Sequence, residues 1–518
     1  MIIAPLLSLL VIHVAANAKI GSFNPLWTYF GYDEANYTYT ANGRKLIHEL
    51  SELSRTPVYI RAHNLLTTGN GVPALKWSST NAYTEDTSGH PVYDWTIVDK
   101  IFDTYLAVRA KPFVEIGFMP EALSTHPQPY RHTWPNGGID TGWAYPPNSY
   151  AKWDRLIYEW VRHCVDKYGK SEVESWYWEV WNEPDIMYWH GTPEQYDELY
   201  DHTAAAVKRA LPTARIGGPA STGPARPKAA AFLRQFLQHC GVVGTPLDFI
   251  SFHAKGRPEV VEGRVRMGLP QQLKDVDSGF QIVTAFKQFR NLPIILSESD
   301  PEGCAACSAQ NHPQNAYRNG TLYPVYVAEA FDKILRLAAQ DRANFAGMLT
   351  WAFEFEDQPY FAGFRALATN GIDKPVLNIF RMLGLMRGDI VKTENDRDVD
   401  ALATRSGNQL AAMVWNYNGD SEPAQPADVD TIISGIPPTA TRVLVEHYRI
   451  DHDRSNSYTA WQEMGSPQHP TPQQYAKLES AGQLQMLESP RWMTVRDGVL
   501  KLHFSLPRNA VSLLRLSW

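Results

Sequence analysis

Two glutamates each close an apolar run of the chain. Glu183 ends the run Trp176-Tyr-Trp-Glu-Val-Trp-Asn-Glu183, and Glu298 ends Pro293-Ile-Ile-Leu-Ser-Glu298. A pair of carboxyl groups can divide acid–base work, because one can donate a proton while the other stays ionised. Three tryptophans precede Glu183, and a carboxyl group beside apolar rings keeps its proton more readily. Glu183 is therefore the candidate acid and base, and Glu298 the candidate nucleophile.

Other polar residues follow apolar runs in the same way. Asn182 carries a neutral amide that can donate a hydrogen bond to a hydroxyl group. The remaining candidates are His63, His253, Lys255 and an acidic cluster of Glu354, Glu356 and Asp357. Each has a structural alternative: His63 suits a hydrogen-bonded core histidine, and Lys255 suits a loop lysine paired with Glu356.

The apolar runs alternate with helical patterns between about residues 20 and 385, which indicates βα units around a parallel sheet. The runs lie at 58–63, 112–118, 176–183, 215–219, 247–253, 293–298 and 347–353, and a strand near Ile20–Phe23 makes eight. Eight units predict a (β/α)₈ barrel of the α/β class with catalytic side chains at the C-terminal strand ends. Glu183 and Glu298 then end the fourth and seventh strands, on opposite sides of the ring.

Beyond residue 390, short alternating runs such as 409–415, 441–446 and 511–516 are separated by Pro, Gly, Asp and Asn. This pattern predicts an antiparallel β-sandwich, with a boundary near residues 386–396. The segment Trp77–Trp95 lacks helical periodicity and is predicted to be a hairpin or long loop inserted after the second strand. Long loops favour a closed pocket and exo action.

The first residues suggest export. An apolar run from Ile2 to Val14 precedes Ala16-Asn17-Ala18, so we expect a leader over residues 1–18, a barrel over 19–390, a sandwich over 391–518 and a secreted or periplasmic protein. The alternative is a buried first strand. The run is too short to span a bilayer, for which about 18 apolar residues are needed.

The composition excludes several partners. A formal net charge of −7 provides no basic surface for nucleic acid, and no membrane partner is expected. Cys304-Ala-Ala-Cys307 favours a local disulfide or two thiols over zinc, because no second Cys or His pair lies at ligand spacing. We therefore expect no cofactor. The oligomeric state stays open, a homo-oligomer included, as does glycosylation of the sequons at Asn36 and Asn319.

With these motifs in place, residues 20–385 resemble glycoside hydrolase family 39, which includes β-xylosidases and α-L-iduronidases. Trp181-Asn182-Glu183-Pro184 resembles its acid/base motif and Ile295-Leu-Ser-Glu298 its nucleophile strand. The resemblance implies a retaining mechanism acting on an oligosaccharide, and a trailing β-sandwich. It also implies that Arg61, His63, Phe118, His253 and Trp351 shape the sugar pocket, although Arg61 would equally suit a buried ion pair and Trp351 barrel packing.

The substrate is harder to predict. Glu354-Phe-Glu356-Asp357 and Ala362-Gly363-Phe364 after the last barrel strand resemble the xylosidases, with Glu356 as a substrate-binding residue, whereas Lys255 after His253 resembles the iduronidases. Arg365 could hold a carboxylate or close a loop. We expect a β-xylosidase. The alternatives are an α-L-iduronidase-like enzyme, an α-L-arabinosidase, a β-glucosidase, a β-galactosidase or a carbohydrate-binding barrel without activity.

Overall fold

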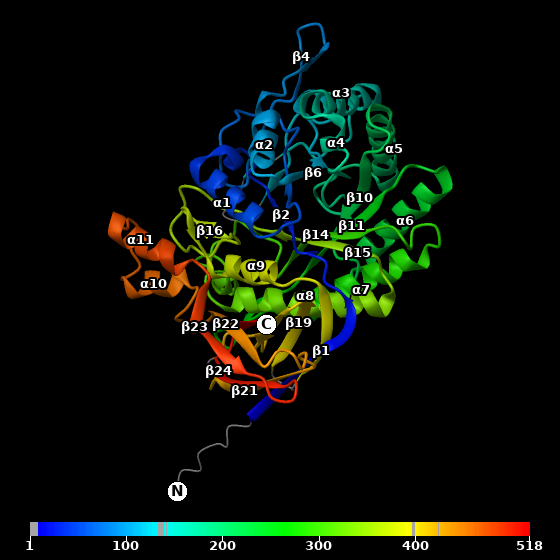
Figure 1. Cartoon of the computed structure of the whole chain (residues 1–518). Helices are drawn as coiled ribbons and strands as arrows, with labels where there is room; N and C mark the ends of the chain where they lie inside the picture. Colours follow the sequence, from blue (N-terminus) through cyan, green and yellow to red (C-terminus); the bar gives the residue numbers. More distant parts are fainter. Residues whose placement is uncertain (1–8, 133–138, 141, 396–398, 423) are drawn as a thin grey trace.

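Eight parallel strands close into a barrel in the computed structural model, which describes residues 9–132, 139–140, 142–395, 399–422 and 424–518 (Figure 1). In ring order the strands are β2 (Tyr29–Tyr32), β3 (Tyr59–Ala62), β6 (Lys111–Ile116), β9 (Tyr177–Val180), β10 (Arg215–Ser221), β11 (Phe249–Lys255), β14 (Ile294–Asp300) and β15 (Phe345–Trp351). The predicted (β/α)₈ barrel is confirmed, with β9 fourth and β14 seventh in the ring.

The first barrel strand was misplaced by the sequence analysis. It is β2 rather than the segment Ile20–Phe23, and it pairs with β15 on one side and β3 on the other. β2 is short and contains Gly31, where an added Cβ would lie 2.4 Å from the Trp351 ring. The glycine permits this close approach but also makes β2 a weak strand pattern.

Helices surround the barrel. They are α1 (Ala41–Glu52), α2 (Thr96–Ala107), α3 (Tyr150–Tyr168), α4 (Lys170–Val173), α5 (Pro193–Ala210), α6 (Pro227–Val243), α7 (Leu269–Ala285), α8 (Leu322–Asp341) and α9 (Pro375–Leu385). The start of α5 is fixed by its sequence, because Thr192 and Gln195 form a reciprocal capping box and Pro193 occupies the first turn. Trp153, Trp160 and other apolar side chains of α3 are buried against the barrel.

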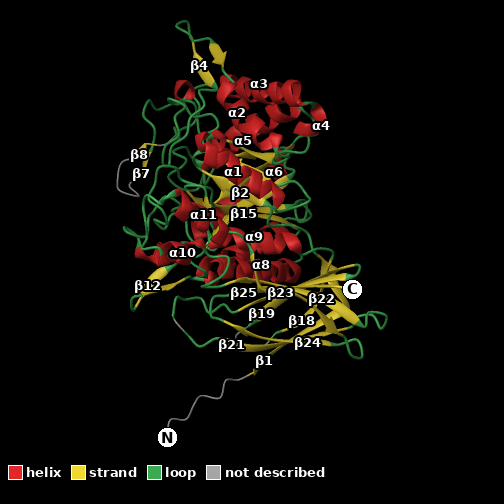
Figure 2. Cartoon of the chain, turned by 60° about the vertical axis from the view of Figure 1, so that its left-hand side comes forward, coloured by secondary structure: helices red, strands yellow, loops and turns green. Residues whose placement is uncertain are grey.

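Small elements decorate the barrel loops. They are β4 (Tyr83–Glu85) with β5 (Pro91–Tyr93), β7 (Arg131–His132) with β8 (Ile139–Asp140), β12 (Glu259–Val261) with β13 (Arg264–Arg266), β16 (Ala368–Thr369) with β17 (Ile372–Asp373), and the 3₁₀ turns Ala35–Tyr39, Glu121–Leu123 and Pro313–Arg318. The β4–β5 pair confirms the predicted hairpin. It projects at the edge of the molecule near α3, where Lys152 pairs with Glu85 at 2.8 Å (Figures 1 and 2).

A nine-stranded sheet forms the second part of the molecule. Its order is β23 (Gln485–Thr494), β22 (Arg442–Ile450), β25 (Val511–Ser517), β20 (Gln409–Trp415), β19 (Asp400–Ser406), β18 (Asp389–Glu394), β1 (Leu9–Ser22), β21 (Ala427–Ser434) and β24 (Leu500–Leu506). Strands from both ends of this order share one apolar core, as expected of a sandwich. The pairs are antiparallel except β1 with β21, which is parallel.

The N-terminal segment differs from the expected leader. Residues 9–22 form β1, which lies inside the sheet between β18 and β21 and buries Ile12, Val14 and Ala16 in the sandwich core. The structure thus matches the alternative interpretation of a buried first strand, and cleavage after Ala18 would remove most of β1. The sandwich accordingly takes residues from both ends of the chain, not from 391–518 alone.

The sheet packs on the barrel through α8, which lies between them in both views (Figures 1 and 2). Trp415 on β20 donates from Nε1 to Glu329 on α8 at 2.7 Å, and Lys333 pairs with Asp400 at 3.1 Å. Two further helices, α10 (Ser457–Glu463) and α11 (Pro472–Ala481), lie beside the barrel, where Lys45 pairs with Glu479 at 2.7 Å. None of the helices in the described ranges has the length and apolarity of a membrane span.

The cysteines and sequons take defined positions. Cys304 and Cys307 form a disulfide, which resolves the open choice between a bond and two thiols, whereas the other two cysteines are free and buried. Asn36 and Asn319 are also buried, and their amides donate to the carbonyls of Ser79 and Phe361. Glycosylation of either asparagine would therefore require that part of the fold to open.

Candidate active site

A pocket of about 470 Å³ opens at the C-terminal ends of the barrel strands. Six of the residues singled out in the sequence line it: His63, Asn182, Glu183, Lys255, Glu298 and Trp351. They come from or directly follow β3, β9, β11, β14 and β15. The barrel therefore gathers side chains that are as much as 288 positions apart in the chain, as the strand-end argument requires.

Glu298 lies on the floor of this pocket among cationic and imidazole groups. Lys255 Nζ donates to Glu298 Oε2 at 2.5 Å, and His253 Nδ1 lies 3.8 Å from the same oxygen. Arg61 Nη1 and His63 Nε2 lie 3.3 and 3.6 Å from Oε1. Burial alone would raise the pKa of Glu298, but the charges of His253 and Lys255 and the groups of His63 and Arg61 hold it well below its usual range. Glu298 is therefore ionised, with polar donors around it.

Glu183 has a different setting. Its Oε1 lies 2.8 Å from His253 Nδ1, and its backbone N–H donates to the carbonyl of Ala220 at 2.9 Å. The backbone φ of +45° places Glu183 in the left-handed region, which is uncommon for a residue with a side chain. Such conformations concentrate where a chain must aim a functional side chain. Here the turn directs Glu183 into the pocket.

The tryptophans before Glu183 do not surround it as the sequence suggested. Trp178 packs edge-on against Trp160 of α3 with ring centroids 5.7 Å apart, and Trp176 packs against Phe102 of α2. Alternation along β9 turns these rings toward the helices, because successive strand residues face opposite sides of the sheet. The contact that the structure gives the Glu183 carboxyl group is His253.

The two carboxyl groups face each other at short range. One side-chain oxygen of Glu183, one of Glu298 and a nitrogen of His253 all lie within 4.8 Å of one another. Such a triad could in principle ligate a cation. However, Lys255 already donates to Glu298, so a metal ion there would meet an ammonium group at close range. The donor set suits proton transfer and nucleophilic attack better than metal binding.

Arg61 lies beneath the pocket rather than in its lining. It is fully buried, donates to Glu179 at 2.6 Å and to Asn182 Oδ1 at 3.1 Å, and pairs with Glu115 at 3.0 Å. Arg61 therefore orients Asn182 and places positive charge below Glu298. Arg61 therefore forms the buried ion pair that the sequence analysis gave as an alternative. Its hydrogen bond to Asn182 connects this pair to the site.

His63 is a pocket residue with two acidic partners. Its Nδ1 lies 2.9 Å from Asp33 and its Nε2 lies 3.0 Å from Glu115. Burial lowers the pKa of His63, but Glu115 and Asp33 together raise it well above its ordinary value. His63 is therefore a cation, with its ring 4.2 Å from that of Trp351.

Five functional positions escaped the sequence analysis: Asp33, Lys76, Glu115, Glu179 and Asp300. Asp33 follows β2 and binds Lys76 at 2.6 Å and the Trp351 indole at 3.3 Å. A correct first strand would have revealed Asp33, because it is the acid at that strand's end. Glu115 and Glu179 lie inside strands, where an acid in an apolar run was the available signal.

Lys255 and Arg365 are held by carboxylates of the barrel. Lys255 pairs with Asp300 at 2.8 Å in addition to Glu298, not with Glu356 or solvent as the alternative had it. Arg365 is fully buried, donates to the Trp351 carbonyl at 2.7 Å and lies 3.5 Å from Asp300. Arg365 therefore closes the loop after β15 and does not reach the pocket.

Three predicted binding residues do not line the pocket. Glu356 accepts a hydrogen bond from Thr40 at the start of α1 and is not among the residues that line the pocket. Phe118 is buried against Trp181, with ring centroids 5.3 Å apart, and supports the pocket wall from behind. His253 is buried below Glu183. Sequence position could not distinguish these supporting places from the lining, because all three residues follow or end strands.

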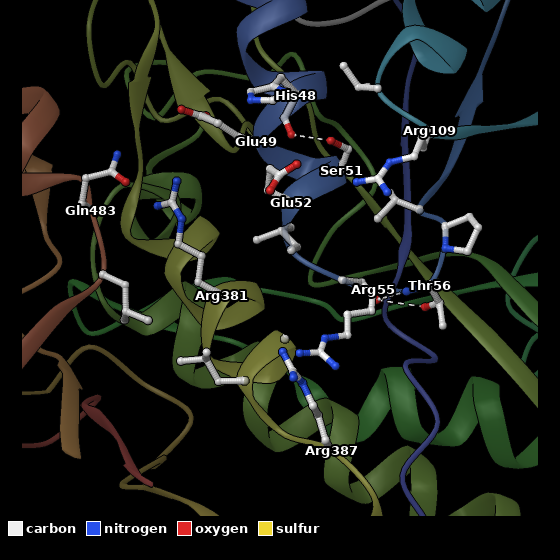
Figure 3. Close-up of a pocket in the computed structure, with 18 residues that line it drawn as sticks. His48, Glu49, Ser51, Glu52, Arg55, Thr56, Arg109, Arg381, Arg387 and Gln483 are labelled. Atoms are coloured by element: carbon white, nitrogen blue, oxygen red, sulfur yellow. Dashed lines mark hydrogen bonds between the residues drawn. The ribbon is translucent and has the colours of Figure 1, made fainter. Parts of the chain in front are cut away.

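A larger cavity lies elsewhere. About 790 Å³ in volume, it lies at the N-terminal ends of the strands, between the end of α1 and α9 (Figure 3). Its lining includes Arg55, Arg109, Arg381 and Arg387 but neither Glu183 nor Glu298. In this fold the catalytic groups belong at the opposite face, so the smaller pocket is the candidate active site.

A (β/α)₈ barrel that sets two carboxyl groups against each other at the ends of its fourth and seventh strands is the framework of a glycoside hydrolase. The chain belongs to the glycosyl hydrolases family 39, whose model matches residues 10–498. The resemblance seen in the sequence is thereby confirmed.

The relatives of this chain include proteins named β-xylosidase and proteins named α-L-iduronidase. The chain is 28 % identical to a β-xylosidase of Geobacillus stearothermophilus over 476 residues, 88 % of this chain and 86 % of that protein. It is 26 % identical to the α-L-iduronidase of Mus musculus over 399 residues, 69 % and 60 % of the two chains. A crystal structure of a monomeric β-xylosidase from Caulobacter crescentus CB15 has a TM-score of 0.79 and 25 % identity, covering 98 % of this chain and 99 % of that one.

Proposed function

We propose that this glycosidase is a retaining, exo-acting β-xylosidase that releases xylose from the non-reducing end of xylo-oligosaccharides. Glu298 attacks the anomeric carbon while Glu183 protonates the departing oxygen, and Glu183 then takes a proton from the water that hydrolyses the glycosyl-enzyme. The observation that carries the proposal is the separation of the two carboxyl groups. Oxygens within 4.8 Å fit a retaining pair, which needs about 5–5.5 Å between carboxyl groups, and leave too little room for the water of an inverting enzyme.

The two glutamates have the environments that these roles require. A nucleophile must be ionised, and the charges around Glu298 depress its pKa. An acid and base must exchange protons, and Glu183 is the more exposed of the two, at 15 % of its side chain against 7 %. His253 can support both protonation states of Glu183, because its Nδ1 can donate to the ionised form.

A neutral sugar is favoured by the charge balance of the deep pocket. The cations that line the deep pocket are Lys76, Lys255 and His63, and each is matched by a carboxylate. Lys76 and His63 pair with Asp33, and Lys255 pairs with Asp300 and Glu298. An iduronide would need a cation for its own carboxylate, and Lys255 is engaged. The names of the first relatives point the same way.

The loop after β14 supports exo action. Residues 302–314 contribute Glu302, Gly303, Cys304, Cys307, His312 and Gln314 to the pocket wall. The β4–β5 hairpin, on which the expectation of a closed pocket rested, contributes none of its residues. A pocket walled in this way accepts a chain end more readily than the middle of a polysaccharide.

The proposal is tested with nitrophenyl glycosides of β-D-xylose, α-L-arabinose, β-D-glucose, β-D-galactose and α-L-iduronic acid. We expect the xyloside to have the highest kcat/KM and its first product to keep the anomeric configuration by NMR. An iduronide turned over faster than the xyloside would replace the proposed substrate. An inverted product would remove the mechanism.

The nucleophile is identified separately by covalent trapping. A 2-deoxy-2-fluoro xyloside with a good leaving group should glycosylate the enzyme and form an ester that hydrolyses slowly, because fluorine destabilises the oxocarbenium-like transition states. Peptide mapping should place the label on Glu298. Label on Glu302, Glu356 or Asp357 would contradict the assignment.

A further inference from the structure

The mouth of the catalytic pocket continues into a second hollow of about 370 Å³. The two share Arg226, Gly256 and Arg257, and the remaining lining is Ala225, Pro227, Gln271 and Lys274. We propose that this hollow binds the leaving-group side of the substrate and selects a saccharide that carries a carboxylate there, such as a uronic acid branch. The inference rests on the proposed glycosidase function and adds a class of substrate to it.

Three cations of the hollow lack protein partners. Arg226, Arg257 and Lys274 are exposed, and in the described ranges their cationic groups form no hydrogen bond or ion pair with another residue. Asp275, which lines the neighbouring catalytic pocket, senses the charge of Arg226 but accepts its hydrogen bonds from the backbone of Ala225 at 3.0 Å and from the Gln271 side chain at 3.4 Å. Positive charge at this mouth is therefore available to a ligand, on a molecule whose formal net charge is −7.

The deep pocket has the opposite character. Its cations are already matched by Asp33, Glu298 and Asp300. An anionic group on the substrate would gain little there, because it would compete with a buried carboxylate for each cation. The charge pattern therefore separates a neutral sugar at the floor from an anionic one at the mouth.

Both arginines are carried by loops that are fixed to the barrel. Arg226 is the N-cap residue of α6, and the turn before it packs so closely on α7 that a Cβ on Gly223 would lie 2.3 Å from the Asp275 carboxyl group. Arg257 follows Gly256, where a Cβ would lie 2.6 Å from the Pro301 carbonyl oxygen. The backbone positions of Arg226 and Arg257 are thus set before a ligand arrives.

The direction of the substrate follows from burial. The scissile bond must lie between Glu183 and Glu298, and the lining beyond them toward the floor is buried at Asp33, His63 and Trp351. The released sugar fills that floor, so the leaving group must point outward across Arg226 and Arg257. The described residues that line the hollow include no aromatic ring on which a sugar could stack. The planar guanidinium group of an arginine, in contrast, can bind a carboxylate through two parallel hydrogen bonds.

The test compares two xylo-oligosaccharides that differ only in a glucuronic acid branch on the leaving-group portion. We expect the wild-type enzyme to have a KM about 5- to 20-fold lower for the acidic one at low salt, an advantage that shrinks as salt screens the exposed charges. The double variant Arg226→Gln/Arg257→Gln should lose the advantage, so that its KM values for the acidic and the neutral oligosaccharide become equal. Lys228→Gln removes one charge from the same end of α6 outside both cavities and should keep the advantage.

Calorimetric binding to a Glu298→Gln variant separates this inference from the proposed function. Preferential binding of the acidic oligosaccharide that is lost with the two arginines supports the inference even if xylosides are not turned over. Equal affinity for the two oligosaccharides, or an advantage that survives Arg226→Gln/Arg257→Gln, overturns it, whether or not the enzyme hydrolyses the neutral substrate.

Discussion

At the scale of single residues, the central contrast is between two glutamates with different neighbours. Glu298 contacts Lys255 at 2.5 Å and lies 3.3 Å from Arg61, whereas Glu183 contacts His253. Identical side chains thereby acquire different electrostatic surroundings, which the separate roles of acid and nucleophile in one catalytic cycle need. Each glutamate accordingly has its own expected mutational signature.

Replacement of Glu183 should affect substrates according to their leaving groups. Glu183→Ala removes the proton donor, so hydrolysis of xylobiose should fall by about 10²- to 10⁴-fold, while glycosylation by a dinitrophenyl xyloside should change far less. Azide should restore part of the turnover and give a glycosyl azide of retained configuration, because it attacks the intermediate without a base. An equal loss for both substrates, with no azide product, would assign the proton transfer to another group.

Removal of the Lys255 charge should move the acid limb of the pH profile. The pKa of Glu298 is depressed, so activity is lost as pH falls through that pKa. Burial raises the pKa of Glu298, and the charge of Lys255 opposes this effect. Lys255→Met removes that charge, so the pKa of Glu298 rises and the acid limb of kcat/KM should shift to higher pH. Lys255→Arg keeps the charge and serves as the control. An unchanged limb in Lys255→Met would mean that another group controls it.

At the scale of elements, the loop after β14 is organised around one buried arginine. Arg318 donates to the carbonyls of Cys304 and Cys307 at 2.9 and 3.0 Å and pairs with Glu302. Because these residues line the pocket, the arginine joins the local stability of the loop to the shape of the mouth. The Cys304–Cys307 disulfide lies within the same loop.

Loss of Arg318 should therefore reduce both the stability of the protein and its affinity for substrate. Arg318→Met leaves the half-buried Glu302 and several carbonyls without their donor, which should reduce the free energy of unfolding by about 3–5 kcal/mol. We also expect KM for xylo-oligosaccharides to rise more than kcat falls. Thermal unfolding and steady-state kinetics measure the two effects, and Arg318→Lys should be intermediate. A normal KM in a destabilised Arg318→Met enzyme would show that the loop does not shape binding.

The strand ends were the predictable part of the site. Glu183, Glu298, His63, Asn182, Lys255 and Trp351 could be found because a barrel places its strand ends together whatever the loops do. The partners were not predictable. That Lys255 binds Asp300 rather than Glu356 depends on the stagger of β11 against β14, and a single sequence does not specify that register.

The fold was predictable for the same reason, but the prediction was wrong for the first strands. Regular alternation identified β20, β22 and β25, whereas β2 has four residues and a glycine. The first apolar run was ambiguous, because a leader and a strand that is buried on one face both need aliphatic residues. The alternation that buries Ile12, Val14 and Ala16 while His13 is exposed was the signal that favoured the strand.

At the scale of the whole molecule, β1 ties the two ends of the chain into one sheet. A variant that lacks residues 1–18 loses the burial of Leu10, Ile12 and Val14, about 5 kcal/mol. It also takes from β21 its partner on one side and from β18 part of its partner, so the sheet is interrupted in its middle. Since a domain is stable by only about 5–15 kcal/mol, this variant should be insoluble or melt far below the full chain. Removal of residues 1–8 is the control. Equal melting of the two truncated forms would show that residues 9–18 do not stabilise the sheet.

The position of β1 has a consequence for the order in which the protein is made. Ser434 on β21 hydrogen-bonds the carbonyl of Val14 at 3.5 Å across 420 positions of the chain. At about 5–20 residues per second, the ribosome needs roughly 20–80 s to travel that distance. For most of this interval β1 is an aliphatic strand whose two partners are not yet made, since β18 ends at Glu394 and β21 at Ser434. The sheet is therefore completed after translation. A chaperone that shields the first twenty residues would cover the aliphatic segment that is most prone to aggregate in the nascent chain.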